Sequence, residues 1–396
     1  MTRNAPLLGR VGLRSTLVLA ATAALALTAC GGGGSGSSTA QGDIRVGTVL
    51  PLTGPSAATA AQYLAGIEAA IGAANDKGGI NGRKVVLDKV DDGFEVPRTI
   101  AGAKKLAQQD DVVGIIGPYG TNAAASLVPQ AAQLKVPMVG PLAYSETWYR
   151  PVNPYLFPLL PGTRAIYQAM TRYAVESKGA RRVAVLATDG PVGDETIAGA
   201  QQSLTAAGLA PTTVIRVAGG SADYSGVLSQ VKATGADAVV VQSIVTDLAT
   251  MTKNAANVGL TAPFYAGGAS SESSFATLAG SAAQGAFGVV SVDLSGSSAQ
   301  WASYSENIRS RTKADPSSSF TAVGYTAAEV MLSALRASGD KVDAATVTAR
   351  LADGTADTLA GPVAFSADDH LGIRKLLLTR VDGGKVTLAG DTLPVS

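Results

Sequence analysis

From Asp43 onward, short apolar runs of four to seven residues alternate with longer segments of helical periodicity. The first two runs, Ile44 to Leu50 and Val85 to Val90, flank an Ala-rich helical segment from Ala60 to Asn75. This alternation is typical of βα units, in which helices join neighbouring parallel strands. The sequence therefore predicts an α/β fold with parallel sheets.

The alternation falls into two series. In the first, we predict helices at 97–109 and 121–134 and strands at 112–117 and 136–140. Pro151 to Pro161 contains four prolines interleaved with aromatic residues, so it cannot form a regular helix and is interpreted as a connection between lobes. The second series is predicted to contain a helix at 163–177, a strand at 182–188, a helix at 194–207, a strand at 212–217, a helix at 224–233, a strand at 238–242, a helix at 247–258, a short strand near Phe264, a connecting strand at 289–292 and a long helix at 320–338.

Length and composition limit the functions open to the chain. Its 396 residues predict two or three domains, at roughly 100 to 200 residues per domain. A formal net charge of +1 provides no basic surplus for nucleic acid. One Cys and one His exclude a disulfide framework, a Cys/His zinc site and any mechanism that needs two histidines.

The N-terminal segment has the pattern of a secretory signal. Three arginines precede an apolar run from Leu17 to Leu27, which predicts a signal peptide over residues 1–29 that is too short to span a membrane. Leu27-Thr28-Ala29-Cys30 resembles the bacterial lipobox, in which the Cys is acylated and becomes the mature N-terminus. The Gly/Ser-rich tract at 30–42 fits a flexible tether. We therefore expect an exported protein anchored by lipid at Cys30, on the extracytoplasmic face of a bacterial membrane or in the periplasm; the alternative is a chance Cys after an ordinary signal peptide.

Catalytic and cofactor motifs are missing from the sequence. It has no G-x-S-x-G nucleophile elbow and, beyond the N-terminal glycine tract, no phosphate-binding glycine loop. His370, in a polar turn, is interpreted as a solvated turn residue rather than a general base or a metal ligand. Asp91-Asp92 is interpreted as a solvated strand end, because no third acid nearby would complete a Mg²⁺ site. We expect neither enzymatic activity nor a cofactor nor a metal.

Two helix starts are candidates for ligand binding, because ligands of open α/β sheets bind beyond the carboxyl ends of strands, at helix N-termini. The segment Gly114 to Asn122 ends a strand and places Thr121 at the start of the next helix, either as a carboxylate contact or as an N-cap. Asp247 follows the strand at 238–242, where it either interacts with the helix dipole or binds a ligand ammonium. Together they would form an amino-acid site.

Short segments spread from Ile44 to about Thr387 resemble, in order and spacing, the leucine/isoleucine/valine-binding family, the type I periplasmic solute-binding proteins of branched-chain amino-acid ABC importers. The segments that carry the resemblance are Ile44 to Gly47, Pro51 to Pro55, Asn75 to Arg83, Gly114 to Gly120, Val136 to Met138, Asp223 to Ser225, Gly235 to Ala238 and Gly361 to Phe365.

This resemblance implies two Rossmann-like lobes joined by three crossovers and closing as a hinge on a ligand. The N-terminal lobe would comprise 43–160 plus 290–372, and the C-terminal lobe 161–289 plus 373–396. The protein would capture an amino acid and deliver it to ABC permease subunits in the membrane. A ligand sensor that uses the same closure is an alternative.

The resemblance also implies site residues. Thr121 matches the position that holds the ligand carboxylate, and Leu142 and Tyr144 lie in the loop that binds carboxylate and ammonium. Asp247 matches an acid for the ammonium, and Tyr224 is either a ligand contact or a core aromatic.

Two departures from the family pattern bear on ligand identity. Val192 replaces the Tyr that covers the ligand in the D-x-x-Y-G element, and an aromatic of the first loop is replaced near Thr59. Both changes leave leucine itself in doubt, and an amide, a urea or an aromatic acid remains as an alternative ligand.

Overall fold

The computed structural model describes residues 42–296 and 299–395. Gly42–Ser396 forms one compact unit. The predicted signal peptide, Cys30 and the tether up to residue 41 lie outside the described residues. Within the described ranges, no helix is both long enough and apolar enough to cross a membrane.

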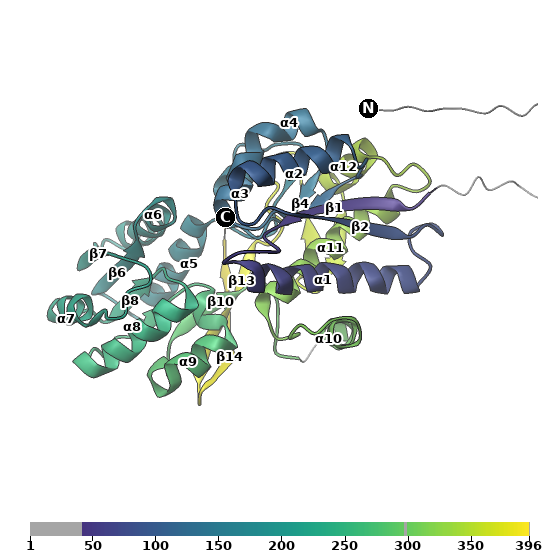
Figure 1. Ribbon diagram of the computed structural model, residues 1–396. Helices are drawn as coiled ribbons and strands as arrows, with labels where there is room; N and C mark the ends of the chain where they lie inside the picture. The colour runs from purple at the N-terminus through teal and green to yellow at the C-terminus, as the bar shows by residue number, and fades with distance from the viewer. Residues whose placement is uncertain (1–41, 297–298, 396) are drawn as a thin grey trace, which may run out of the picture. The chain divides into compact units, whose positions relative to one another are not determined.

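The N-terminal lobe is built on a five-stranded, all-parallel sheet in the order β2-β1-β3-β4-β5. Helices α1 and α11 pack together on one face, and α2 to α4 cover the other (Figure 1). The elements of this lobe are β1 (Ile44–Leu50), α1 (Ala57–Asp76), β2 (Val85–Asp91), α2 (Val96–Gln108), β3 (Ile115–Ile116), α3 (Thr121–Leu127), α4 (Ala131–Leu134), β4 (Met138–Val139), β5 (Leu156–Phe157), α10 (Ala299–Arg311), α11 (Ser319–Ala337), α12 (Ala344–Ala352), β11 (Thr355–Thr358) and β12 (Gly361–Ala364).

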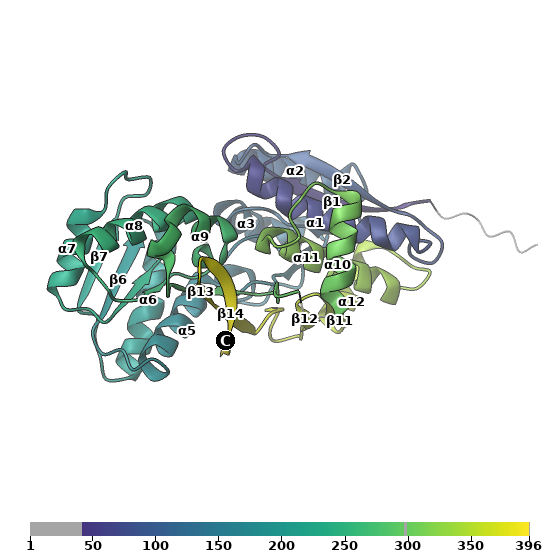
Figure 2. The same ribbon diagram turned by 90° about the horizontal axis from the view of Figure 1, so that it is seen from below.

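The C-terminal lobe is built on a seven-stranded sheet in the order β14-β13-β10-β9-β8-β6-β7. Helices α5 and α6 pack on one face and α7 to α9 on the other (Figure 2). Its elements are α5 (Thr163–Glu176), β6 (Val183–Thr188), α6 (Pro191–Ala206), β7 (Thr213–Val217), α7 (Ser225–Ala233), β8 (Ala238–Val241), α8 (Val245–Val258), β9 (Phe264–Tyr265), α9 (Ser273–Ala279), β10 (Phe287–Val290), β13 (Lys375–Asp382) and β14 (Lys385–Pro394).

The predicted α/β class with parallel sheets is confirmed, with one addition. Strands β13 and β14 form an antiparallel hairpin, and β13 pairs antiparallel with β10. The chain passes between the two sheets after β5, after β10 and before β13, as the predicted three crossovers require.

Several predicted boundaries were wrong. The strand predicted at 112–117 is regular only over Ile115–Ile116, and Gly117 next to it has a left-handed φ of 106°. The helix predicted at 121–134 is interrupted by a 3₁₀ turn at Val128–Gln130, where Pro129 supplies no backbone N–H. The proline-rich connection contains β5, whose Phe157 pairs with Val139.

His370 is not the solvated turn residue that the sequence predicted. Its side chain is 2% exposed, its Nδ1 lies 2.8 Å from the carbonyl oxygen of Leu156, and its ring stacks on Phe157 with centroids 4.5 Å apart. The ring completes the core beside β5, which excludes it from ligand chemistry at the surface.

Glu329 on α11 is an acid with a strongly displaced pKa. Its carboxylate accepts a hydrogen bond from the backbone N–H of Leu359, with a nitrogen–oxygen distance of 2.8 Å. Burial raises its pKa from 4.5 to about 7, against the smaller lowering effects of that hydrogen bond and of Arg336.

We predict that this displacement makes the folded protein less stable as the pH rises. The folded state holds the Glu329 proton up to a higher pH than the unfolded chain does, so its contribution is complete below about pH 4.5 and is lost as the pH passes about 7. Each pKa unit is worth about 1.4 kcal/mol, so the displacement from 4.5 to about 7 places the loss on the order of 3 kcal/mol. Urea unfolding at pH 5, 6, 7 and 8 measures it. Glu329→Gln should flatten the profile, and an unchanged slope in that variant would contradict the assignment.

Candidate functional site

A cavity of about 650 Å³ lies between the two lobes, at the carboxyl ends of their strands. Both lobes supply lining residues through segments that follow β1, β3, β4, β8 and β9. The lining consists of Pro55, Ser56, Thr59, Tyr119, Tyr144, Thr163, Ile166, Tyr167, Val192, Gln242, Ser243, Ile244, Val245, Thr246, Ala266, Gly267, Gly268, Ala269, Glu272, Ser319 and Phe320.

Five helices of at least 13 residues begin at this cavity. They are α1, α5, α6, α8 and α11, whose first turns contribute Thr59, Thr163, Val192, Thr246 and Ser319 to the lining. The N-terminus of a helix carries a partial positive charge and unpaired backbone N–H groups. The cavity can therefore stabilise an anionic group such as a carboxylate without a cationic side chain.

Glu272 is the one charged residue among the described residues that line the cavity. It directly precedes α9 in the C-terminal lobe, and its carboxylate accepts a hydrogen bond from the hydroxyl of Ser319 on α11 of the N-terminal lobe. Burial raises the pKa of Glu272; the Ser319 hydroxyl opposes this effect, and the charge of Asp315 adds to it. A nearby cation stabilises the ionised form of a partly buried carboxylate such as this one.

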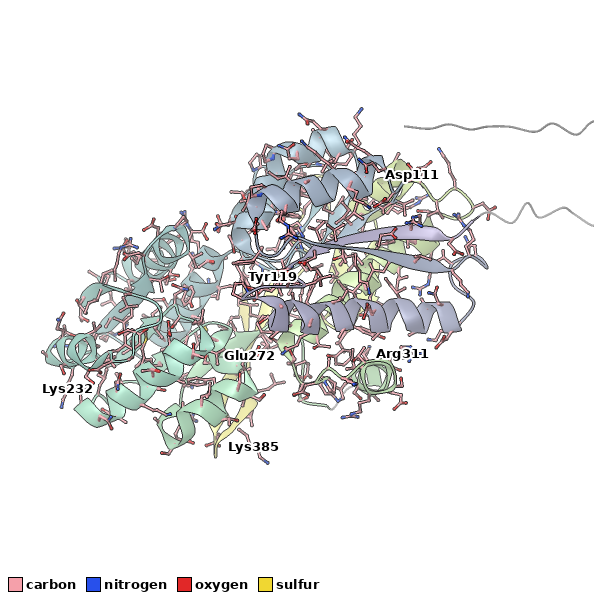
Figure 3. The ribbon with its side chains drawn as sticks, viewed as in Figure 1. Asp111, Tyr119, Lys232, Glu272, Arg311 and Lys385 are labelled. Atoms are coloured by element: carbon pink, nitrogen blue, oxygen red, sulfur yellow. The ribbon has the colours of Figure 1, made fainter. Side chains whose placement is uncertain are left out.

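Aromatic side chains form much of the remaining wall: Tyr119, Tyr144, Tyr167 and Phe320. The hydroxyl of Tyr167 donates to the carbonyl oxygen of Val241 at 3.1 Å, which fixes that ring. Burial, and then the charge of Glu272, raise the pKa of Tyr144 to about 12, so its hydroxyl is a neutral donor beside the acid. Figure 3 labels Tyr119 and Glu272, which come to this cavity from different lobes.

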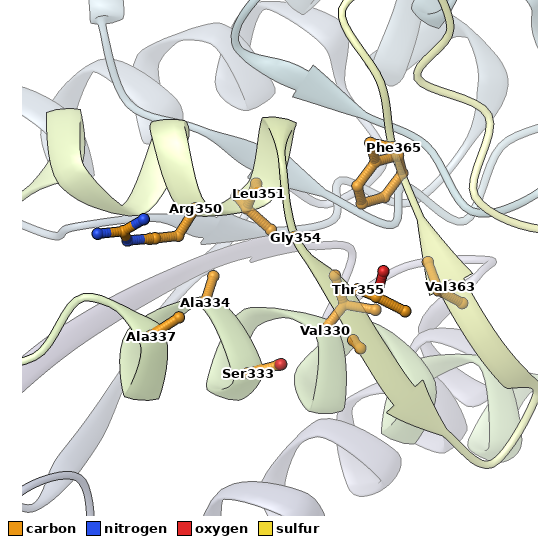
Figure 4. A pocket seen from close by; sticks show the side chains of 11 residues that line it. Val330, Ser333, Ala334, Ala337, Arg350, Leu351, Gly354, Thr355, Val363 and Phe365 are labelled. Atoms are coloured by element: carbon orange, nitrogen blue, oxygen red, sulfur yellow. The ribbon is translucent and has the colours of Figure 1, made fainter.

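A second, much smaller pocket of about 40 Å³ lies between α11, α12 and the β11–β12 hairpin (Figure 4). Val330, Leu351 and Phe365 are among the apolar side chains that line it. Its volume holds little more than one water molecule, so it is a packing gap and not a ligand site. Over the ranges 42–296 and 299–395, no group of three or more His, Cys, Asp or Glu side chains could hold a metal ion.

A family model described as "Periplasmic binding protein" matches residues 43–385. The chain belongs to the periplasmic binding protein family. It is 25% identical over 352 residues to "Leu/Ile/Val-binding protein homolog 3" of Brucella melitensis, covering 88% of this chain and 94% of that protein.

Two solved structures show the same fold. The LivJ substrate-binding protein of Streptococcus pneumoniae, in complex with isoleucine, has a TM-score of 0.75 at 20% identity and covers 89% of this chain and 99% of its own. A solute-binding protein of an ABC transporter from R. palustris, in complex with benzoate, has a TM-score of 0.75 at 21% identity and covers 90% and 98%. These similarities confirm the two-lobed type I fold that the sequence resemblance implied.

In this periplasmic binding protein, two of the six predicted ligand residues line the cavity, namely Tyr144 and Val192. Thr59, near the altered first loop, also lines it. Thr121 begins α3 and is half-buried, but it is not part of the lining. The backbone groups of Leu142 pair within the lobe, the N–H with Pro118 and the carbonyl with Gly120.

Asp247 and Tyr224 are placed away from the cavity lining. The carboxylate of Asp247 is buried and accepts a hydrogen bond from the backbone N–H of Gly220 at 2.8 Å, so it supports the loop between β7 and α7. The hydroxyl of Tyr224 donates to the carbonyl oxygen of Ala218 at 3.1 Å in the same region. Tyr224 is 3% exposed and belongs to a buried apolar cluster of the C-terminal lobe.

Sequence reasoning missed Glu272, the acid that does line the cavity. A signal was present, because Glu272 follows a short apolar run around Phe264 and the glycines at 267 and 268, and directly precedes a helix. Strand β9 is only two residues long, however, so its carboxyl end could not be located from the apolar pattern alone.

Proposed function

We propose that this protein is the extracytoplasmic solute-binding component of an ABC importer and captures an amino acid by closure of its two lobes. The observation that carries the proposal is the pairing of one partly buried acid, Glu272, with five helix N-termini around one cavity. This arrangement complements both charges of a zwitterion. The names of its relatives and the isoleucine bound to LivJ support an amino acid as the solute.

Export and anchoring complete the proposal. The basic, apolar and small-residue pattern of residues 1–29 supports a signal peptide, and the lipobox-like Leu27 to Cys30 supports a lipid on Cys30. Residues 30–42 would tether the binding domain at the membrane, where it meets the permease subunits. The absence of Cys30 acylation in protein isolated from its native membrane, measured by intact mass, would contradict the anchor.

Within the cavity, we assign Glu272 as the partner of the ligand ammonium. The Tyr144 hydroxyl, beside Glu272, would make a further polar contact with the ligand. The carboxylate would face the first turn of α1, near Thr59. The rings of Tyr119 and Phe320 would cover the ligand side chain. Val192, which replaces an aromatic in the family pattern, leaves room there for a larger side chain.

Calorimetric titration with each of the twenty L-amino acids tests this function. At least one should bind with a dissociation constant in the micromolar range or below, corresponding to roughly 8 kcal/mol or more of binding free energy. Because the described residues that line the cavity include one acid and no cationic side chain, the matching decarboxylated amine and deaminated acid should both bind much more weakly. Absence of heat with all twenty would rule the proposal out.

An aromatic acid is the second candidate ligand, favoured by the four aromatic rings of the wall and by the benzoate bound to the R. palustris protein. A ligand without an ammonium gains nothing from an ionised Glu272 and is repelled by it. Benzoate binding that strengthens when Glu272 is neutralised would therefore favour this candidate.

A further inference from the structure

Phe94 is an exposed aromatic residue in a strained backbone conformation. Its side chain is 49% exposed and its φ is 67°, in the left-handed region that bulky residues rarely adopt. Strain of this kind persists only where the surrounding structure imposes it, and it concentrates at functional positions.

Two aspartates build the loop that presents Phe94. The Asp91 carboxylate accepts hydrogen bonds from the backbone N–H groups of Leu52 and Gly93, both at 2.9 Å. The Asp92 carboxylate accepts from the Phe94 backbone N–H at 2.9 Å and from the Thr99 hydroxyl. Asp92 is fully buried, which corrects the prediction of a solvated strand end for this residue, whereas Asp91 is half-buried. The carboxylates hold the loop in one conformation.

The loop holds the Phe94 ring beside the cavity. The ring packs edge-on against Tyr119 with centroids 5.9 Å apart, and Tyr119 lines the cavity from the N-terminal lobe. Gly120 provides the space for this contact, since a Cβ there would lie 3.0 Å from the Phe94 ring. The aromatic pair thus extends the cavity wall outward.

Ile244 is the corresponding feature of the opposite lobe. It immediately precedes α8, lines the same cavity as Tyr119, and is 63% exposed. Four large hydrophobic residues are exposed within the part of the chain that the structure describes, and Phe94 and Ile244 are the two most exposed. Exposed apolar residues that lie together mark interaction sites. Two such residues beside one cavity, one from each lobe, therefore indicate a surface that another apolar group covers.

We propose that Phe94 and Ile244 are the two halves of an apolar clasp, each covering the other when the lobes close. This inference rests on the proposed closure. Closure narrows the cavity that Tyr119 and Ile244 share, and the Phe94–Tyr119 pair is the apolar surface of the N-terminal lobe that meets Ile244. Burial of both side chains would then stabilise the closed state independently of the contacts that the ligand makes.

The test measures lobe separation directly. Spin labels on Lys104→Cys of α2 and Lys253→Cys of α8 report the distance between lobes in the full chain, in a Cys30→Ser background that has no other Cys. Distances are recorded without ligand, with L-leucine and with benzoate. Phe94→Asn removes the ring with a residue that tolerates a left-handed backbone, and Ile244→Ala removes its partner. Val214→Ala and Leu278→Ala are controls at the other two exposed hydrophobic residues, which are outside the cavity lining.

The clasp predicts that Phe94→Asn and Ile244→Ala each reduce the ratio of closed to open molecules about fivefold to tenfold, because each forfeits the burial of an apolar side chain. The double variant should fall no further than either single variant, since both remove the same contact. The two control variants should behave like the parent.

Independent, multiplying effects of the two substitutions, or none, would overturn the clasp. An unchanged distance in the presence of an amino acid that calorimetry shows to bind would overturn it as well, because the ligand would then bind without closing the lobes. The amino-acid titration decides the proposed function separately, since a chain that binds an amino acid without closing retains its ligand but has no clasp.

Discussion

Replacement of Glu272 by Gln is expected to weaken amino-acid binding about 100-fold. Gln keeps the shape of the side chain and an oxygen that can accept from the Ser319 hydroxyl, but it removes the charge that faces the ligand ammonium. Loss of one partner of a buried charge pair costs roughly 2 to 5 kcal/mol, and each 1.4 kcal/mol is tenfold in affinity. Calorimetry with the tightest-binding L-amino acid measures the change.

Asp247→Asn is the matched control, because Asp247 is the acid that the family resemblance matched to the ligand ammonium. Its carboxylate accepts a hydrogen bond from Gly220 and lies outside the cavity lining. Ligand affinity should therefore change less than about twofold, because a few contact residues carry most of the binding energy. The reverse result, with a large loss at Asp247 and none at Glu272, would restore the assignment made from the sequence.

Binding should also depend on pH through Glu272. Burial raises the pKa of this carboxyl, and only its ionised form attracts an ammonium. Affinity is therefore complete above the raised pKa and is lost as the pH falls through it, at a higher pH than an ordinary Glu would give. The Glu272→Gln variant should show no such loss over the same range.

Strands β1 and β6, which are long and buried, were predicted to within one residue of their bounds, and the short strand predicted near Phe264 is confirmed as β9. Apolar runs such as those of β1 and β6 are continuous because both faces of their sheets are covered by helices, and this leaves a clear pattern. Strands β3, β4, β5 and β9 have two residues each. Their apolar runs are too short to show where the strand ends and the loop begins. The position of each cavity loop depends on where these short strands end.

The site was harder to predict than the fold because position after a strand does not determine where a side chain points. Asp247 and Glu272 both stand near the start of a helix that follows a strand of the same sheet. The Asp247 carboxylate accepts a hydrogen bond from the backbone of a neighbouring loop, whereas the Glu272 carboxylate accepts one from Ser319 across the cleft. That choice depends on three-dimensional neighbours, Gly220 and Ser319, which are distant in sequence. His370 was misjudged for the same reason, since β5 covers it.

Gly66→Ala is expected to destabilise the N-terminal lobe by about 3 kcal/mol or more. Helices α1 and α11 cross at two glycines: a Cβ on Gly66 would lie against the carbonyl oxygen of Thr321 and 2.6 Å from the backbone nitrogen of Tyr325, and one on Gly324 would meet the backbone of Tyr63. Overpacking of a core costs roughly 1 to 3 kcal/mol and occasionally more. The upper end applies here, because the clashing atoms are backbone and a side-chain rotation cannot relieve them.

Gly72→Ala, two turns along the same helix, provides the control. A Cβ there meets only the side chain of Arg311 at 3.1 Å, which is flexible and can move. In the absence of a backbone clash, the higher helix propensity of Ala should stabilise the protein by up to about 1 kcal/mol. Urea unfolding of the two variants should thus shift in opposite directions from the parent. Equal shifts in the free energy of unfolding would contradict this prediction. They would show that helix propensity, and not the close crossing of α1 and α11, determines the effect of a substitution at residue 66.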